Sequence, residues 1–289
     1  MGSMGARKLK GGRDSCDGPG TWQEWRRPAT RSWHSRNRSS VLTEMNWIRT
    51  IRPCVPAAGE VHLWKADFAD WVGRLAELKC TLSLDEVNRS DRFLRNEDRD
   101  RYIFAHGVLR RVLAACRGCE PGTLVFDLGD HGKPFLAIPV IESESIEFNL
   151  SHSGDLVLIG VTSSCPLGVD VERLSRKVEF EGLGDRFFSS EESEAIRLRP
   201  EGERRRVFFD TWVCKEAFIK AVGDGLTMPL DSFAVRFEDE QTLVGDSAGK
   251  ENPRLRTSWF LDRFEVAPDY VGAVAASTET LAITGFLLQ

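Results

Sequence analysis

The sequence predicts an α+β fold with mainly antiparallel sheets, and three observations lead to this class. Short segments rich in β-branched residues recur along the chain after residue 56, which is typical of strands. Longer segments carry apolar residues at helical spacing. Both kinds recur in each half, about residues 58–165 and 166–289, so we expect two α+β halves of similar make-up.

Composition places few restrictions on function but excludes some classes. The hydrophobic content of 41% and charged content of 29% are typical of a soluble globular protein. A net charge of −5 gives no reason to expect a nucleic-acid partner. No apolar run approaches the roughly 18 residues that span a bilayer, and no secretion signal is visible at the start. The seven scattered cysteines are interpreted as reduced thiols, so we expect a cytoplasmic protein without a membrane partner.

Residues 1–55 differ from the rest of the chain. They carry ten basic and four acidic residues through Thr50 and show no sustained apolar period. We interpret them as a basic, disordered extension, in which Met45 is a candidate for the native start. A nucleic-acid or membrane-surface arm is the alternative interpretation.

The first half, residues 56–165, begins with the alternating segment Glu60–Trp64, a predicted strand. A broken helical region follows from Asp67 through Phe93. A longer helix is expected from Asn96 to about Ala115, where apolar residues form one stripe. Its other face is basic, and either a solvated surface or an anion-binding edge fits that pattern. The basic residues of that face are Arg99, Arg101, His106, Arg110 and Arg111.

Three further segments complete the first half. Leu124–Leu128 is a predicted strand that leads into a turn at Gly129–Pro134. The polar segment Glu147–Gly154 is followed directly by the apolar run Leu156–Val161. That run is typical of a buried central strand.

The second half, residues 166–289, opens with the predicted strand Gly168–Arg173, on which Asp170 and Glu172 share a face. A helical stripe later in the chain includes Glu216 and Lys220, which are neighbours because they are four residues apart. The remaining predicted strands are Asp231–Phe237, Trp259–Val266, Val271–Ala276 and Leu281–Leu288.

If this strand and helix pack together, three carboxylates and one lysine converge. The carboxylates are Asp170, Glu172 and Glu216, which are hard oxygen ligands of the kind that Mg²⁺ prefers. Each acid alone is more often a surface carboxylate or an ion-pair partner. Their placement on a short apolar strand and beside Trp212 favours a site for a divalent cation and a phosphate.

Two other motifs carry candidate binding residues. Lys133, between Gly132 and Pro134, either serves turn chemistry or is presented to a phosphate. Ser151 and His152 precede Ser153-Gly154, which lacks the Gly-x-Ser-x-Gly frame of a hydrolase nucleophile. We interpret His152 as a donor to a phosphate or a polar lid over a cofactor, with a structural histidine as the alternative.

The order and spacing of these motifs resemble the Sfp-type 4′-phosphopantetheinyl transferases, from about Arg89 to Ala276. The segments that carry the resemblance are Phe148–Ser153, Gly168–Glu172, Phe187–Ser189, Trp212–Lys220, Gly223–Leu226 and Pro229–Phe233. It implies a pseudo-dimer of two similar subdomains, each a small mainly antiparallel sheet packed with helices. Coenzyme A would bind in the cleft between them.

The resemblance also implies roles for individual residues. Asp170, Glu172 and Glu216 would hold Mg²⁺ against the coenzyme A pyrophosphate. Lys220 would contact the phosphates and neutralise the departing group. The implied coenzyme A-binding residues are Arg89, Arg101, Gly132, Lys133, Pro134, Ser151, His152, Asp170 and Lys220. The chain departs from some relatives at Glu86, where they have a lysine, and at Tyr102, where they have a small hydroxyl residue.

The implied reaction transfers the 4′-phosphopantetheinyl group to a serine of an acyl, peptidyl, aryl or polyketide apo carrier protein and releases 3′,5′-ADP. The partner supplies the nucleophile, and Glu216 is the expected base, directly or through a metal-bound water. Catalysis is thus expected from Glu216 and Lys220, in a monomer that contains its own pseudo-dimer interface. A non-catalytic module that binds coenzyme A or a carrier protein, and an unrelated magnesium-phosphate hydrolase, are the alternatives.

Overall fold

A computed structural model describes residues 43–49, 54–137, 146–238, 241–247 and 251–289. Most of the expected disordered extension, residues 1–55, lies outside these ranges. Residues 43–49 of that segment nevertheless form two short strands. Within the described residues, no helix combines the length and the apolar character that crossing a membrane requires.

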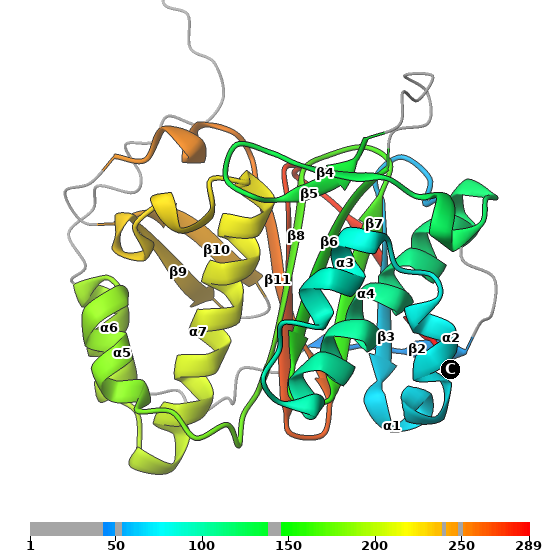
Figure 1. Cartoon of the computed structure of the whole chain (residues 1–289). Helices are drawn as coiled ribbons and strands as arrows, with labels where there is room; N and C mark the ends of the chain where they lie inside the picture. The colour runs from blue at the N-terminus through cyan, green and yellow to red at the C-terminus, as the bar shows by residue number, and fades with distance from the viewer. Residues whose placement is uncertain (1–42, 50–53, 138–145, 239–240, 248–250) are drawn as a thin grey trace, which may run out of the picture. The chain divides into compact units, whose positions relative to one another are not determined.

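The fold is α+β, as predicted, and its first main sheet has five strands in the order β2-β13-β3-β7-β6 (Figure 1). β3, β7 and β6 pair in antiparallel fashion, whereas β13 runs parallel to both β2 and β3. The C-terminal strand therefore joins the sheet of the first half. The strands are β2 Trp47–Arg49, β3 Glu60–Asp67, β6 Glu147–Ser153, β7 Leu156–Thr162 and β13 Ala282–Leu287.

The second main sheet has four strands in the order β1-β11-β12-β8. β11, β12 and β8 are antiparallel neighbours, and the short β1 is parallel to β11. Its strands are β1 Thr43–Glu44, β8 Leu167–Arg173, β11 Phe260–Ala267 and β12 Tyr270–Ala276. Two hairpins stand apart from the main sheets: β4 Phe126–Leu128 with β5 Pro134–Leu136, and β9 Phe233–Glu238 with β10 Gln241–Asp246.

Each half contains one helix of 22 residues. α4 covers the predicted helix of the first half and ends at Gly118, and α7 ends at Gly223; both glycines adopt positive φ, the left-handed geometry that terminates helices. Figure 1 shows α4 beside β6, β7 and β3, and α7 beside β8. The helices are α1 Phe68–Trp71, α2 Leu75–Lys79, α3 Leu84–Ser90, α4 Asn96–Arg117, α5 Phe180–Phe187, α6 Ser190–Arg197 and α7 Glu201–Val222.

Three apolar clusters form the core of the part of the chain that the structure describes. One lies between α4 and the first sheet, and a second lies between α7 and the second sheet. The third joins the two sheets, with Leu63, Leu158, Val169 and Val274 fully buried. β7, predicted as a buried central strand, is buried along its whole length. The shared third cluster holds the two sheets together, so the position of β8 against the first sheet is fixed by packing.

Two predicted elements differ in detail. The predicted strand Asp231–Phe237 begins only at Phe233, because Leu230–Ser232 form a 3₁₀ turn in which the Ser232 hydroxyl donates to the Pro229 carbonyl. The strand predicted from Leu124 begins at Phe126, after a 3₁₀ turn at Pro121–Thr123. In both places local side-chain and proline chemistry forms a 3₁₀ turn before the strand, so the strand begins later than the alternating pattern predicts.

Candidate active site

The two main sheets meet along β6 and β8, each of which is the edge strand of its sheet. Three alternate backbone amides of β8 point toward β6, and each donates a hydrogen bond to a β6 side chain instead of to a backbone carbonyl group. We call this contact the β6–β8 seam. Its pairs are Asn149 Oδ1 with the Val169 amide at 2.9 Å, Ser151 Oγ with the Val171 amide at 3.4 Å, and Ser153 Oγ with the Arg173 amide at 3.1 Å.

Asp170 is the most constrained carboxylate at this seam. Its Oδ1 accepts hydrogen bonds from Ser151 Oγ at 2.8 Å and from Lys220 Nζ at 2.6 Å. Its other oxygen, Oδ2, is buried and has no hydrogen-bond partner within the described chain. A buried carboxylate oxygen without a partner is costly, which is a physical reason to expect a cation or a donor there.

Glu172 lies two residues along the same face of β8 and is also buried. Its Oε2 accepts a hydrogen bond from Ser153 Oγ at 2.6 Å. Its Oε1 forms an ion pair with Arg176 at 2.8 Å, but the Arg176 side chain is 56% exposed. The buried partner of Glu172 is therefore a serine hydroxyl.

α7 approaches β8 closely enough to add two charged groups. A Cβ atom on Gly168 would overlap the Ala217 carbonyl oxygen and the Ala221 amide nitrogen, so the helix backbone rests directly on this glycine. The close approach places Lys220 against Asp170 and brings Glu216 toward the same edge.

Glu216 is half-buried, and burial is the main reason why its pKa is raised above the ordinary value. The negative charges of Asp170 and Glu172 raise the pKa further, while Lys220 opposes them. The three predicted carboxylates are therefore close enough to interact electrostatically. Lys220 Nζ also donates to Ser151 Oγ at 3.1 Å, which links both sides of the seam.

The donor set fits a divalent cation in its chemistry. It offers hard carboxylate oxygens, a partnerless buried oxygen on Asp170, and accumulated negative charge on one edge. In the described part of the chain, no group of three or more His, Cys, Asp or Glu side chains is already arranged as a metal site. Lys220 and Arg176 neutralise the first two carboxylates instead. The ligand set Asp170, Glu172 and Glu216 stays a prediction.

His152 lies between the two seam serines on β6, and the alternation of the strand turns its side chain to the opposite face. Desolvation lowers its pKa, and the positive charges of His106 and Lys220 lower it further, against the opposing effect of Asp170. The neutral imidazole is therefore favoured at pH 7. His152 is thus near the predicted site, and its role in coenzyme A binding stays a prediction.

The β4–β5 turn reaches the second half through Lys133. Its Nζ donates to the Leu167 carbonyl at the start of β8 at 2.9 Å, and burial lowers its pKa. Gly132 adopts a φ of +83°, and Pro134 begins β5. The turn thus lies at the end of β8 that precedes Asp170.

The two arginines predicted to bind coenzyme A have contacts with other residues of the first half. Arg101 on α4 donates to Asp155 Oδ1 at 2.8 Å, and Arg89 on α3 is exposed with its guanidinium 5.9 Å from the Tyr102 ring centre. Within the described chain, neither has a hydrogen bond or ion pair with the seam carboxylates. Glu86 binds the buried Arg110 at 2.7 Å, so its charge is neutralised inside the first half.

Family models match both halves of the chain. The model for the 4′-phosphopantetheinyl transferase superfamily matches residues 166–275, and that for the N-terminal part of a 4′-phosphopantetheinyl transferase matches residues 62–164. The 4′-phosphopantetheinyl transferase HetI of Nostoc sp. strain PCC 7120 is 41% identical over 238 residues, which are 82% of this chain and 95% of HetI. The chain belongs to the 4′-phosphopantetheinyl transferase superfamily. The resemblance predicted from the motifs is confirmed.

Two relatives from Bacillus subtilis support the same assignment. The 4′-phosphopantetheinyl transferases ffp and Sfp are 34% and 31% identical to this chain, and each match covers 68% of the chain and 82% of the relative. The two separate family models are consistent with the α+β pseudo-dimer fold that the resemblance implies, and the exact bounds of the two subdomains stay a prediction.

Three residues that support the site of this 4′-phosphopantetheinyl transferase-family chain were not predicted from the sequence. They are Asn149, Ser153 and Lys215. The first two accept β8 amides across the seam, which depends on contacts between sheets. Lys215 lies in the same motif as Glu216 but is fully buried, with its Nζ 2.8 Å from Glu192 Oε2. The period-2 alternation of β6, which puts Asn149, Ser151 and Ser153 on one face, was the available signal for the first two.

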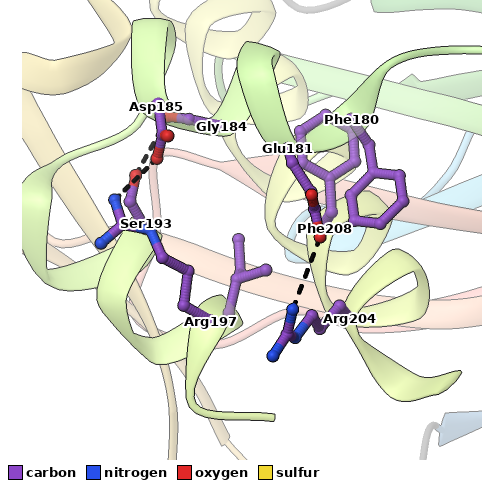
Figure 2. A pocket seen from close by; sticks show the side chains of 9 residues that line it. Phe180, Glu181, Gly184, Asp185, Ser193, Arg197, Arg204 and Phe208 are labelled. Atoms are coloured by element: carbon purple, nitrogen blue, oxygen red, sulfur yellow. Dashed lines mark hydrogen bonds and ion pairs between the residues drawn. The ribbon is translucent and has the colours of Figure 1, made fainter. Parts of the chain in front are cut away.

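A separate pocket of this superfamily member lies between α5, α6 and α7 (Figure 2). Phe180 and Phe208 form its apolar wall, and Figure 2 shows the ion pairs of Arg197 with Asp185 and of Arg204 with Glu181 at its sides. None of the predicted site residues lines it. The pocket is therefore distinct from the β6–β8 seam.

Proposed function

We propose that this chain transfers the 4′-phosphopantetheinyl group of coenzyme A to a serine of an apo carrier protein and releases 3′,5′-ADP. Family membership supports the reaction class. The observation that carries the site assignment is Asp170, whose Oδ1 is held by Ser151 and Lys220 while Oδ2 is buried without a partner.

Asp170, Glu172 and Glu216 would hold Mg²⁺. When bound, the cation offsets negative charge on the pyrophosphate of coenzyme A. Without it, three carboxylates on one edge would repel the phosphates that the reaction requires there. This requirement and the partnerless oxygen of Asp170 are the reasons for proposing a cation at this position.

Glu216 is the proposed general base, which accepts the proton of the attacking serine hydroxyl. It is a carboxylate at the seam edge, close enough to Asp170, Glu172 and Lys220 to interact with their charges. The bond between the serine oxygen and the β-phosphorus forms as the bond to the departing 3′,5′-ADP oxygen breaks. Lys220 is proposed to neutralise charge on that group, because its ammonium already lies at the seam and its side chain is 28% exposed.

Most of the residues that bind coenzyme A are proposed to lie in the first half. His152 would bind near the 3′-phosphate, with Ser151 beside it in the chain; the Ser151 hydroxyl itself lies on the seam face and donates to Asp170. Gly132, Lys133 and Pro134 would line the adenine and ribose. The neutral imidazole of His152 can donate one hydrogen bond without requiring a second charge. The remaining proposed contacts to the nucleotide phosphates are Arg89 and Arg101.

The proposed partner is a carrier protein of fatty-acid, polyketide or nonribosomal-peptide biosynthesis. We also propose a cytoplasmic monomer without a nucleic-acid or membrane partner. Its two subdomains would be residues 56–165 and 166–289, with β13 of the second range completing the sheet of the first. The family models that match within each of these ranges support the subdomains.

The experiment is to incubate the full chain with coenzyme A, Mg²⁺ and a panel of apo acyl, peptidyl and polyketide carrier proteins. Intact-mass measurement should show one added phosphopantetheinyl group on at least one carrier, and chromatography should show an equal amount of 3′,5′-ADP. A carrier in which the acceptor serine is replaced by alanine is the control and should keep its mass.

A non-catalytic module that binds coenzyme A or a carrier protein is not favoured, because the relatives are named as transferases. It predicts binding of coenzyme A with no mass change on any carrier. A magnesium-phosphate hydrolase predicts turnover of coenzyme A in the absence of a carrier protein. Either outcome in the panel experiment would contradict the proposed function.

A further inference from the structure

The type of β6 side chain at each position of the β6–β8 seam depends on whether the neighbouring β8 residue is acidic. Ser151 accepts the amide that follows Asp170, and Ser153 accepts the amide that follows Glu172. Asn149 accepts the amide that follows Gly168, where no carboxylate is present. A hydroxyl therefore stands on β6 at both positions where the neighbouring β8 residue is acidic.

A serine hydroxyl at these positions has a determined orientation. It has one proton to donate and lone pairs to accept with. Ser153 Oγ accepts the Arg173 amide at 3.1 Å, and its proton is donated to Glu172 Oε2 at 2.6 Å. The backbone of β8 thus fixes the hydroxyl, and the hydroxyl in turn fixes one oxygen of the carboxylate.

Glu172 depends on this contact more than Asp170 depends on Ser151. Asp170 also has the ammonium of Lys220 at 2.6 Å. The only cation paired with Glu172 in the described chain is Arg176, whose side chain is 56% exposed, and such pairs contribute little. Ser153 is itself only 8% exposed, so its hydrogen bond is shielded from water.

We propose that Ser153 is a positioning residue for Glu172. Its hydroxyl holds Oε2 on the seam and leaves Oε1, which Arg176 contacts, as the oxygen that a divalent cation takes. This inference rests on the proposed cation site, to which it adds a residue that touches neither substrate nor cation. Without the hydroxyl, repulsion from the neighbouring carboxylates would turn Glu172 away, and the Arg173 amide would lose its acceptor.

The test is to measure Mn²⁺ binding to the full chain by isothermal titration calorimetry, in the absence of coenzyme A. Ser153→Ala should weaken Mn²⁺ binding about 10- to 100-fold, the range found for residues that orient metal ligands. Ser193→Ala on α6 is the matched control, because Ser193 is also a buried, hydrogen-bonded serine but lies outside the seam. It is 5% exposed, and its hydroxyl donates to the Gly184 carbonyl at 3.0 Å. The Ser193→Ala chain should bind Mn²⁺ as the wild type does.

A second pair of variants covers a failure of Ser153→Ala to fold. Ser153→Thr keeps the hydroxyl, and Ser153→Val replaces it with a methyl group of similar size on a strand that accepts β-branched residues. Thr should restore Mn²⁺ affinity to within a few fold of wild type, and Val should not. Equal affinities for Thr and Val, or an Ala variant that binds as tightly as Ser193→Ala, would overturn the inference.

A missing cation site and a missing role of Ser153 give different experimental results. A wild-type chain that transfers the group but binds no Mn²⁺ contradicts the cation site and this inference together. A wild-type chain that transfers and binds Mn²⁺, with unchanged affinity in the Ser153 variants, contradicts the inference alone. A wild-type chain that binds Mn²⁺ but modifies no carrier contradicts the proposed function and leaves the positioning result to be read from the titrations.

Discussion

Lys215 and Lys220 lie five residues apart on α7 and differ in burial and in partner. Lys215 is fully buried, and its Nζ donates to the Leu230 and Phe233 carbonyls at 2.8 and 2.6 Å. Lys220 is 28% exposed and pairs with Asp170. Five residues on a helix turn the side chain by well over a quarter of a circle, so the two ammonium groups serve different faces.

Replacing each lysine by methionine should separate these roles. Lys215→Met leaves the buried Glu192 carboxylate without its cation and should lower the free energy of unfolding by about 3–5 kcal/mol. Lys220→Met should keep the fold and reduce transfer by roughly 10²- to 10³-fold. Urea unfolding and the mass assay measure the two effects. Normal stability in Lys215→Met, or normal transfer in Lys220→Met, would show that the corresponding role is wrong.

Glu86 makes a second prediction at this scale, through pH. Burial alone would raise its pKa, but hydrogen bonds from His106 and the Ser83 amide, with the charge of Arg110, lower the pKa to about 2. An acid whose pKa is lowered in the folded chain stabilises the fold fully at pH values above its unfolded pKa, near 4.5. This contribution is lost as the pH falls toward 2.

Glu86→Gln should therefore be less stable than wild type at pH 7, by on the order of 3 kcal/mol, and the difference should shrink between pH 5 and pH 2. Urea unfolding across that pH range measures it. Glu77→Gln is the control, because Glu77 is 60% exposed in its ion pair with Arg74 and should change stability little. A stability difference that does not vary with pH would contradict the assigned pKa.

Sequence analysis could place Asp170 and Glu172 on one face because a strand has a period of two. It could place Glu216 beside Lys220 because a helix brings residues four apart together. It could not predict the partners of Ser153 or Lys215. Those contacts join elements distant in the chain, and their pairing depends on how strands of different sheets align.

At the scale of elements, the fit of α7 against β8 depends on Gly168. A side chain there would meet the helix backbone at Ala217 and Ala221 and would push the two elements apart. Gly168 lies at the start of the predicted strand, and its identity alone did not indicate a helix crossing. The helix itself and its end at Gly223 were predictable, because its apolar stripe and its terminal glycine are local features.

Gly168→Ala should lower stability by about 1–3 kcal/mol through overpacking. It should also reduce transfer by roughly 10²-fold, because Glu216 and Lys220 move relative to Asp170. The control is Gly202→Ala on α7, where no neighbouring atom lies within 4 Å of the added Cβ. This variant should be neutral or slightly stabilising. Equal behaviour of the two variants in unfolding and transfer would contradict the packing account.

At the scale of the whole molecule, the two α+β halves followed from recurring segment types. The position of β13 did not, because an alternating segment shows that it is a strand but not which neighbour it pairs with. β13 runs between β2 and β3, and Phe286 stacks on Trp64 with ring centres 4.4 Å apart. The end of the chain therefore completes the sheet that carries Ser151 and His152.

Deleting residues 282–289 should abolish the cooperative fold of both halves, because it removes a central strand and the buried Leu288. Thermal unfolding followed by near-ultraviolet circular dichroism measures this, and deletion of Gln289 alone is the control. A truncated chain that unfolds cooperatively at the wild-type temperature would show that the first sheet does not require β13.

The most direct test of the account is the rate at which an accepted apo carrier protein gains mass in the presence of Asp170→Ala. Asp170 is the residue that Ser151, Lys220 and the proposed cation share. We expect the Asp170→Ala chain to unfold cooperatively like the wild type but to add no phosphopantetheinyl group within the time in which the wild type completes the reaction. Undiminished transfer by a folded Asp170→Ala chain would contradict the assignment of the β6–β8 seam as the active site.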